Sequence, residues 1–274
     1  MADYPALEIT FRASSDPFLR DRLYAQLDDF SPVAIDENDE ADRWRVFFRS
    51  ASNRDAARAA LASEASLEAS PIDVADEDWA RRSQDSLKAI DAGGLVIAPP
   101  WDVPTGKPVI VIEPSMGFGT GHHATTRLCL LLLQRLELRA ARVLDVGTGS
   151  GVLALAAWKL GAGDVVAIDN DPDALDNARD NIARNGAAPS IDIIQDDLGG
   201  LRIQRADIVL ANLTGAVLVR YAAELRSLAM DGGYFILSGF APEDVAVIRT
   251  AFAGLELIEE RVEGEWAALS LRLS

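Results

Sequence analysis

The sequence predicts an α/β protein with a doubly wound, mainly parallel sheet, preceded by a small α+β domain. Three observations support this prediction. Beyond about residue 142, short apolar segments alternate with helical patterns. The last two apolar segments, 255–262 and 266–271, follow one another without a helix, which indicates an antiparallel end to the sheet. All 20 glycines lie at or after Gly93, so the chain before that point is a region of different composition.

Residues 1–75 predict a small domain of strands and helices. Leu7–Phe11 alternates apolar and polar residues, as a half-buried strand does. Asp16-Pro17 places a capping residue before a first-turn proline, which predicts a helix. Further strands and a second helix are expected at 33–35, 44–48, 72–74 and after Ser52-Asn53. The resulting order, βαββαβ, is typical of a ferredoxin-like sandwich.

Residues 76–94 are polar and helix-permissive, which predicts a linker helix before a larger domain at 95–274. Asn185-Gly186 should end one of that domain's helices with a left-handed residue. Its seven strands are expected at 142–146, 165–168, 191–194, 208–211, 234–237, 255–262 and 266–271. Its main helices are expected at 151–160, 172–184, 216–229 and 242–252.

Composition excludes several classes of protein. The 274 residues suit one large or two unequal domains at roughly 150 residues each. With 26 Lys+Arg against 43 Asp+Glu, the net charge is −17, which repels nucleic-acid phosphates and argues against direct nucleic-acid binding. Cys129 is the only cysteine, so no disulfide can form within the chain. No apolar stretch approaches the ~20 residues of a membrane helix, and no secretory signal precedes Leu7, so a cytoplasmic protein without a membrane partner is expected.

The segment Leu144–Gly151, LDVGTGSG, carries the most specific chemical signal. It ends the first buried strand and begins a helix, at the edge where doubly wound sheets bind ligands. Gly147 and Gly149 allow a ligand to approach the backbone, and the helix start offers free N–H groups. The spacing differs from the G-x-G-x-x-G of dinucleotide sites, and no P-loop lysine follows. The motif resembles the first motif of class I methyltransferases, which use S-adenosylmethionine.

Acidic residues follow the next two strands. Asp169 ends the second strand, where a carboxylate can accept hydrogen bonds from both hydroxyls of a ribose. Asp171 and Asp173 are expected to be helix-cap and surface charges. Asp196 and Asp197 end the third strand, where either could contact an adenine or both could be turn residues.

Asn212 and Leu213 end the fourth strand, in the sequence Ala-Asn-Leu-Thr. Methyltransferases that act on base amines or on glutamine typically carry Asn-Pro-Pro-aromatic here, and this chain lacks both prolines. Asn212 and the Leu213 carbonyl are nevertheless placed to align an attacking amine, and the sequence shows no clear general base.

A glycine-rich segment with two histidines, 113–126, precedes a helix and suggests a loop that closes over a ligand. Adjacent His122 and His123 make a poor metal site because no cysteine or third ligand lies near them, so no metal is expected. The histidines therefore either cap and orient the loop or act as acid–base groups.

Together these motifs resemble one family closely. Its members carry F-G-T-G-x-H-x-T-T, and Phe118–Thr126 matches every fixed position. With the 145–151 motif, Asn212-Leu213, Asp78-Trp79-Ala80, Pro99-Pro100-Trp101 and Gly264-Glu265-Trp266, the chain is similar to the methyltransferases of large-subunit ribosomal protein L11. The match is dense in the larger domain and limited to size and strand order in the first 75 residues.

The resemblance implies a seven-stranded, Rossmann-like class I methyltransferase domain and S-adenosylmethionine as cofactor. It implies cofactor contacts at Thr126, Gly147, Asp169 and Asn212, to which the reasoning above adds Gly149 and Asp197. It also implies that the N-terminal domain recognises the protein substrate. The expected reaction is methyl transfer to lysine side chains or an N-terminal amine of a ribosomal protein. The alternatives are another protein's lysines, a small molecule, or cofactor binding without catalysis.

Overall fold

The computed structural model describes residues 3–12, 19, 23, 26–27, 30, 32–38, 42–48, 50–62, 64–75, 88–113 and 123–274. The chain divides into two compact units, Met1–Leu87 and Lys88–Ser274. The division falls inside the segment 76–94 that sequence indicates as a linker, and residues 76–87 of that segment lie outside the described residues.

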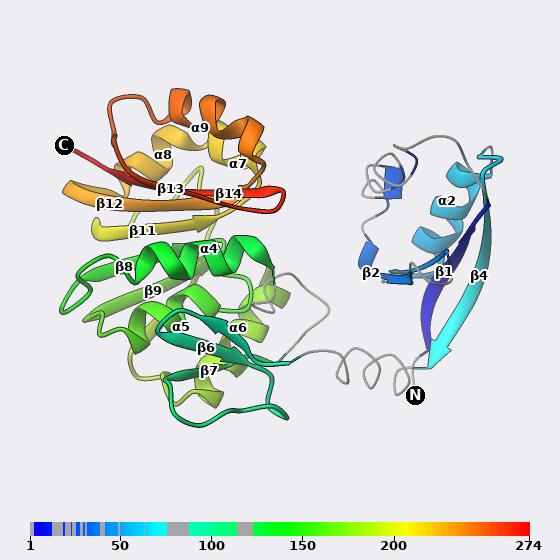
Figure 1. The fold of residues 1–274 in the computed structure, drawn as a ribbon, viewed down its shortest axis with the longest axis horizontal. Coiled ribbons are helices and arrows are strands. Elements are labelled where there is room, and N and C mark those ends of the chain that lie inside the picture. Colours follow the sequence, from blue (N-terminus) through cyan, green and yellow to red (C-terminus); the bar gives the residue numbers. More distant parts are fainter. Residues whose placement is uncertain are drawn as a thin grey trace. The chain divides into compact units, whose positions relative to one another are not determined.

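The first unit contains a four-stranded antiparallel sheet of order β2-β3-β1-β4 (Figure 1). Its strands are β1 (Asp3–Phe11), β2 (Pro32–Asn38), β3 (Arg43–Phe48) and β4 (Leu67–Ala75). With β1 between β3 and β4, this order agrees with the predicted ferredoxin-like sandwich. The helix predicted after Asp16-Pro17 lies mostly outside the described residues. Its residues Leu19, Leu23 and Leu27 are buried in the core of this unit.

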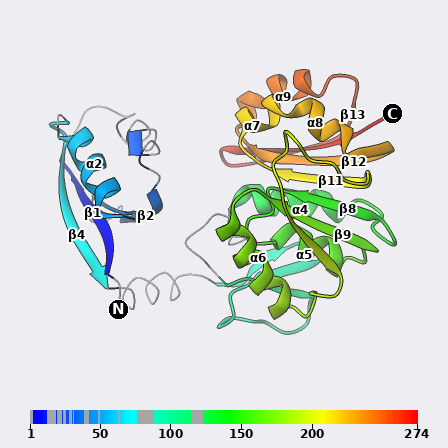
Figure 2. The ribbon, with the colours of Figure 1, turned by 180° about the vertical axis from the view of Figure 1, so that it is seen from behind.

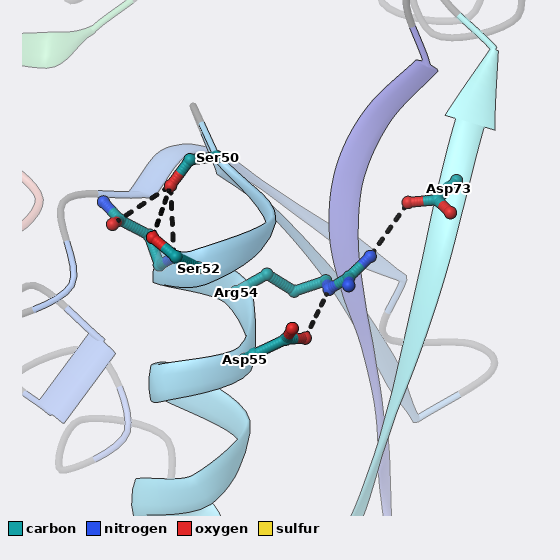
Figure 3. A network of polar contacts seen from close by, with 6 residues as sticks. Ser50, Ser52, Arg54, Asp55 and Asp73 are labelled. Carbon is teal, nitrogen blue, oxygen red and sulfur yellow. Dashed lines mark hydrogen bonds and ion pairs between the residues drawn. The ribbon is translucent and has the colours of Figure 1, made fainter.

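Helix α2 (Ala51–Leu61) begins two to three residues earlier than the predicted Ser52-Asn53 cap implied. Its cap is Ser50, which accepts a hydrogen bond from the Asn53 backbone N–H at 3.2 Å. Arg54 holds this helix against the sheet (Figure 3). Its guanidinium donates to Asp55 at 2.9 Å and, across to β4, to Asp73 at 2.8 Å. The hydrogen bond from Arg54 to Asp73 therefore adds to the apolar packing of Ala57 and Leu61 between this helix and the sheet.

The second unit is built on a seven-stranded sheet of order β10-β9-β8-β11-β12-β14-β13. Strands β10, β9, β8, β11 and β12 run parallel to one another. Strand β14 is antiparallel to both of its neighbours, β12 and β13. The strands are β8 (Arg142–Val146), β9 (Asp164–Asp169), β10 (Ile191–Gln195), β11 (Ala206–Asn212), β12 (Ala229–Phe240), β13 (Glu256–Glu263) and β14 (Trp266–Arg272). The predicted doubly wound sheet with an antiparallel end is confirmed.

Helices cover both faces of this sheet (Figures 1 and 2). One face carries α4 (Ala124–Leu133), α5 (Val152–Lys159) and α6 (Pro172–Arg184). The other carries α7 (Gly215–Arg220), α8 (Ala222–Ser227) and α9 (Val245–Ala251). Each layer has its own apolar core.

Three predicted segments of the larger domain differ from the structure. The helix predicted at 216–229 is split into α7 and α8 at Tyr221, whose φ of −108° and ψ of 22° leave the helical region. Strand β12 already begins at Ala229. The helix predicted at 242–252 is a 3₁₀ turn, Pro242–Asp244, followed by α9.

The prediction of a helix over 76–94 is wrong at its C-terminal end. There the chain begins a small three-stranded sheet of β5 (Ile90–Ala92), β6 (Leu95–Ala98) and β7 (Val109–Val111). Gly93 and Gly94 form a two-residue turn that pairs Ala92 with Leu95, and Gly93 has a φ of +75°. Such a turn favours a hairpin over a continuing helix.

The outer edge of β7 forms hydrogen bonds with the side chain of Asn185, the C-cap residue of α6. Asn185 Oδ1 accepts from the Val111 N–H at 2.9 Å, and its Nδ2 donates to the Val111 carbonyl at 2.7 Å. The amide therefore bonds this edge as a neighbouring strand would. Among the described helices, none combines the length and apolarity needed to cross a bilayer.

Candidate active site

The glycine turn between β8 and α5 forms the centre of the candidate site. Gly147, Gly149 and Gly151 have φ values of +71°, +55° and +81°, in the left-handed region that glycine adopts most easily. The N–H groups of Gly147 and Thr148 both donate to the Ile168 carbonyl of β9, at 2.8 and 3.0 Å. A Cβ on Gly147 would lie 2.3 Å from Cδ2 of Leu213. The turn is therefore closely packed against the end of β11.

Asp145, the acidic residue of the same motif, lies beneath the turn with 1% of its surface exposed. Its Oδ2 accepts from Thr148 Oγ1 at 2.7 Å and from the Ala154 N–H at 2.9 Å. Burial is the main cause that raises the pKa of Asp145 to about 6. Sequence reasoning placed Asp145 in the motif but assigned it no role.

Asp169 lies at the carboxyl end of β9, half-buried beside the turn. Its Oδ2 accepts from the Gly149 N–H at 3.0 Å, and its Oδ1 accepts from the Asp171 N–H at 3.1 Å. Asp171 caps α6, as predicted, by accepting from the Asp173 N–H at 3.0 Å. Each oxygen of Asp169 has one backbone donor, so each retains accepting capacity for a further partner.

Asp197 follows the end of the neighbouring strand β10 and is exposed. Its Oδ1 accepts from the Gly199 N–H at 2.8 Å, which shows the turn role that sequence left open. The Asp196 N–H donates to the Asp169 carbonyl at 3.1 Å, so the segment continues beside β9.

Asn212 and Leu213 lie half-buried at the carboxyl end of β11. The Leu213 N–H donates to the Ser238 carbonyl of β12 at 3.0 Å. Gly239, with a φ of +96°, lies directly against them, and a Cβ there would be 2.3 Å from the Leu213 carbonyl oxygen. The position of the Leu213 backbone therefore depends on a residue without a side chain at 239.

Thr126 lies in the first turn of α4, with 2% of its surface exposed. The residue that caps this helix is His123 and not Thr126. His123 Nδ1 accepts from the Thr125 N–H at 3.4 Å and also contacts Thr125 Oγ1 at 2.8 Å. His123 also packs edge to face on Trp266, with ring centroids 4.6 Å apart. Burial, and then the charge of Arg127, lower the pKa of His123. The capping interpretation of this histidine agrees with the structure, whereas residues 114–122, which include His122, lie outside the described residues.

Asn181 of α6 is a further residue at the site, which sequence reasoning missed. It is fully buried, donates to the Ser150 carbonyl at 3.0 Å and accepts from the Glu113 N–H at 2.9 Å. It thereby joins the end of the glycine turn to the first residue of the predicted loop. An amide on the apolar side of α6, beside Ala178 and Ile182, was the available signal.

The structure thus brings the predicted residues to one edge of the sheet. Thr126, Gly147, Gly149, Asp169, Asp197, Asn212 and Leu213 lie at the start of α4 and at the carboxyl ends of β8, β9, β10 and β11. Two hollows lie elsewhere: one of about 440 Å³ beside α9, and one of about 340 Å³ at the amino ends of β8, β11 and β12. No group of three metal-ligating side chains occurs in the part of the chain that is described.

Comparison with known proteins identifies the family. The family model described as "Ribosomal protein L11 methyltransferase (PrmA)" matches residues 26–274. The ribosomal protein L11 methyltransferase of Pelotomaculum thermopropionicum is 43% identical over 206 residues, which cover 73% of this chain and 67% of that protein. The namesake from Geotalea uraniireducens is 41% identical over 222 residues, covering 73% and 69%.

A solved structure shows the same relationship. The ribosomal protein L11 methylase of Lactobacillus delbrueckii subsp. bulgaricus superposes with a TM-score of 0.63 at 29% identity, over 69% of this chain and 99% of that one. The predicted Rossmann-like, class I methyltransferase fold is confirmed. The chain belongs to the ribosomal protein L11 methyltransferase family and is an S-adenosylmethionine-dependent methyltransferase, as its sequence predicted.

Proposed function

We propose that this chain transfers methyl groups from S-adenosylmethionine to lysine side chains, or to the N-terminal amine, of ribosomal protein L11. The observation that carries the proposal is the meeting of Asp169, the glycine turn and Asn212 at one sheet edge, in a chain of this family. Since that substrate is a ribosomal protein, the proposal includes a cytoplasmic location and requires no direct contact with nucleic acid or membrane.

The residues at the sheet edge fit the cofactor. The two oxygens of Asp169 each have one backbone donor and keep capacity for the two hydroxyls of a ribose. Gly147 and Gly149 carry no side chains of their own, which allows a ligand to approach their backbone. At Gly147 the Leu213 side chain packs where a Cβ would lie. Asp197, whose Oδ1 is used in its own turn, would accept from the adenine amine through Oδ2. Thr126 and Asn212 would contact the methionine end.

Asn212 and the Leu213 carbonyl would align the substrate amine. When bound, S-adenosylmethionine supplies a methyl group on a sulfonium, which departs as a neutral thioether. The amine must attack unprotonated, and neutralising a lysine of pKa ~10.4 at pH 7 costs roughly 4–5 kcal/mol. Two acceptors at fixed positions, an amide oxygen and a carbonyl, direct the nitrogen lone pair without a dedicated base.

The first unit is proposed to recognise the protein substrate, since the site residues all lie in the second unit. A small-molecule substrate would not require such a unit. Another protein's lysines are the remaining alternative, because the similar relatives align over 73% of this chain and not over all of it.

The deciding experiment is transfer of labelled methyl groups to purified proteins. Incorporation into ribosomal protein L11, located on lysine or N-terminal nitrogen by mass spectrometry, supports the proposal. Incorporation into other ribosomal proteins but not L11 would reassign the substrate. Cofactor binding without any transfer would indicate a protein that lacks catalysis.

Asp169→Ala should weaken cofactor binding without unfolding the chain. The loss of charge-assisted hydrogen bonds to two hydroxyls should cost about 1.5–3 kcal/mol, or roughly 10- to 150-fold in Kd. Isothermal titration of S-adenosylmethionine measures this, and Asp192→Asn, an exposed carboxylate on β10, is the charge-matched control. An unchanged Kd for the Asp169 variant would exclude the ribose role.

Thr126→Val keeps the shape of the side chain and removes its hydroxyl. Because His123 is the cap of α4, the apo melting temperature should change little. Cofactor affinity should fall by the ~1 kcal/mol of a typical hydrogen bond, about fivefold. The two measurements are calorimetric titration and a thermal melt. Normal affinity with a lowered melting temperature would show that Thr126 has only a structural role.

A further inference from the structure

Asp145 is a buried carboxylate at the centre of the site, and the proposed chemistry above assigns it no role. It lies on β8 between Ala167 of β9 and Leu210 of β11, and 1% of its surface is exposed. Its two hydrogen bonds, from Thr148 Oγ1 and the Ala154 N–H, reach the same oxygen, Oδ2. Oδ1 accepts no hydrogen bond from the described residues.

No cation neutralises this carboxylate among the residues that the structure describes, since none of their ion pairs includes Asp145. The titratable groups that face it are Cys129 from α4 and Asp169 from β9. Burial raises the pKa of the Cys129 thiol, so it remains uncharged, and Asp169 carries charge of the same sign. At pH 8 Asp145 is therefore a buried anion with two hydrogen bonds but no ion-pair partner among the described residues, an arrangement that costs stability.

The anion lies beneath the cofactor-binding turn. Its hydrogen-bond partners are Thr148 inside that turn and Ala154 in the first residues of α5. Gly147, whose backbone is proposed to face the cofactor, is separated from Asp145 in the chain only by Val146. A stability cost retained at this place indicates that the negative charge has a use in the site.

We propose that Asp145 makes the site prefer the cofactor S-adenosylmethionine, which carries a positive sulfonium, over its product S-adenosylhomocysteine, which lacks that charge. This inference rests on the proposed function. The two molecules share the adenosine and amino-acid parts, and they differ in the methyl group and in the positive charge of the sulfonium. Hydrogen bonds to the ribose or adenine, and attraction to the shared ammonium group, therefore serve both equally. Attraction between the Asp145 carboxylate and the sulfonium serves S-adenosylmethionine alone.

The expected preference is large enough to measure. At an effective dielectric constant of about 20, two opposite unit charges as far as ~12 Å apart attract by roughly the free energy of a tenfold change in affinity. Because a site that holds its product weakly is freed for the next cofactor, the same charge also favours product release.

The test compares the Kd values of the two ligands by isothermal titration at pH 8. Asp145→Asn keeps the shape and an acceptor oxygen, and the ratio Kd(S-adenosylhomocysteine)/Kd(S-adenosylmethionine) should fall about tenfold. Thr148→Val removes a donor but keeps the charge, so it should change both Kd values by a similar factor. Asp192→Asn, an exposed carboxylate, should leave the ratio unchanged.

The pH dependence of the ratio supplies a second arm that needs no variant. Protonation of Asp145 removes its charge, so the wild-type ratio should fall between pH 7 and pH 5, while that of Asp145→Asn stays constant. Since the raised pKa means that ionisation of Asp145 opposes folding above about pH 6, the variant should melt no lower than wild type at pH 8.

Each outcome decides. Equal loss of both ligands in Asp145→Asn, or a wild-type ratio that is constant with pH, would overturn the charge preference and leave the proposed function standing. A wild-type chain that binds neither ligand would overturn the proposed function itself. If Asp145→Asn does not fold, the wild-type pH arm alone gives the answer.

Discussion

Replacing Gly239 with alanine should both destabilise the second unit and disable methyl transfer. The new Cβ would lie 2.3 Å from the Leu213 carbonyl oxygen and 2.7 Å from its carbonyl carbon, and backbone atoms cannot rotate away as a side chain would. Together with a φ of +96°, the expected cost is about 3–5 kcal/mol, or on the order of 10 °C in Tm. Displacement of Leu213 by several tenths of an ångström should lower kcat roughly a hundredfold.

Gly106→Ala is the matched control for this variant. Gly106 has a φ of +104°, and a Cβ there would meet nothing within 4 Å. Its cost should therefore be the strain alone, about 1–3 kcal/mol, with kcat unchanged. Thermal melts and steady-state rates on both variants distinguish the cost of a positive φ for alanine from the effect of the contact between the new Cβ and Leu213. Equal effects at the two positions would show that contact with Leu213 is unimportant.

Deleting residues 1–75 should abolish methylation of the protein substrate and leave cofactor binding nearly intact. The residues proposed to hold the cofactor lie between Thr126 and Leu213, in a unit with its own two apolar cores. Loss of a separate docking unit removes the raised local concentration of substrate, which should lower the rate on the whole protein by at least about a hundredfold.

The shortened chain is tested by calorimetry with S-adenosylmethionine and by methyl transfer to whole ribosomal protein L11. A short lysine peptide from the same substrate is the control, since it should react at similar rates with both chains. Transfer to the whole protein at full rate by the shortened chain would refute the docking role. Loss of cofactor affinity would show instead that the second unit requires the first.

The site edge could be predicted from sequence because its signals are local. A buried strand followed by glycines at 147, 149 and 151 allows one main interpretation, and the order of the strands follows from helices that alternate with them. The acid after each strand then falls at the same edge, since parallel strands end together. Asp171 and Asn185-Gly186 were likewise found from the chemistry of single residues.

The missed features depend on contacts between distant segments. The Gly93-Gly94 hairpin joins strands of three and four residues, too short for periodicity to reveal. Asn181 and Asp145 have roles only through partners brought close by folding, namely Glu113 and Ser150 for one and Ala154 for the other. The break at Tyr221 interrupts a pattern that predicts one helix, and the helix propensities of the residues around it do not mark it.

The Asn185 side chain has a consequence for the outer edge of the small sheet. A sheet ends safely only if its last strand offers no free ladder to another molecule. At Val111 a carboxamide supplies one acceptor and one donor at the spacing of a peptide group, and it has no successor to extend the ladder. A single side chain thus occupies the backbone groups of Val111 that another strand would otherwise pair with. Without the Asn185 side chain, the edge of β7 would offer these backbone groups for pairing with a strand of another molecule.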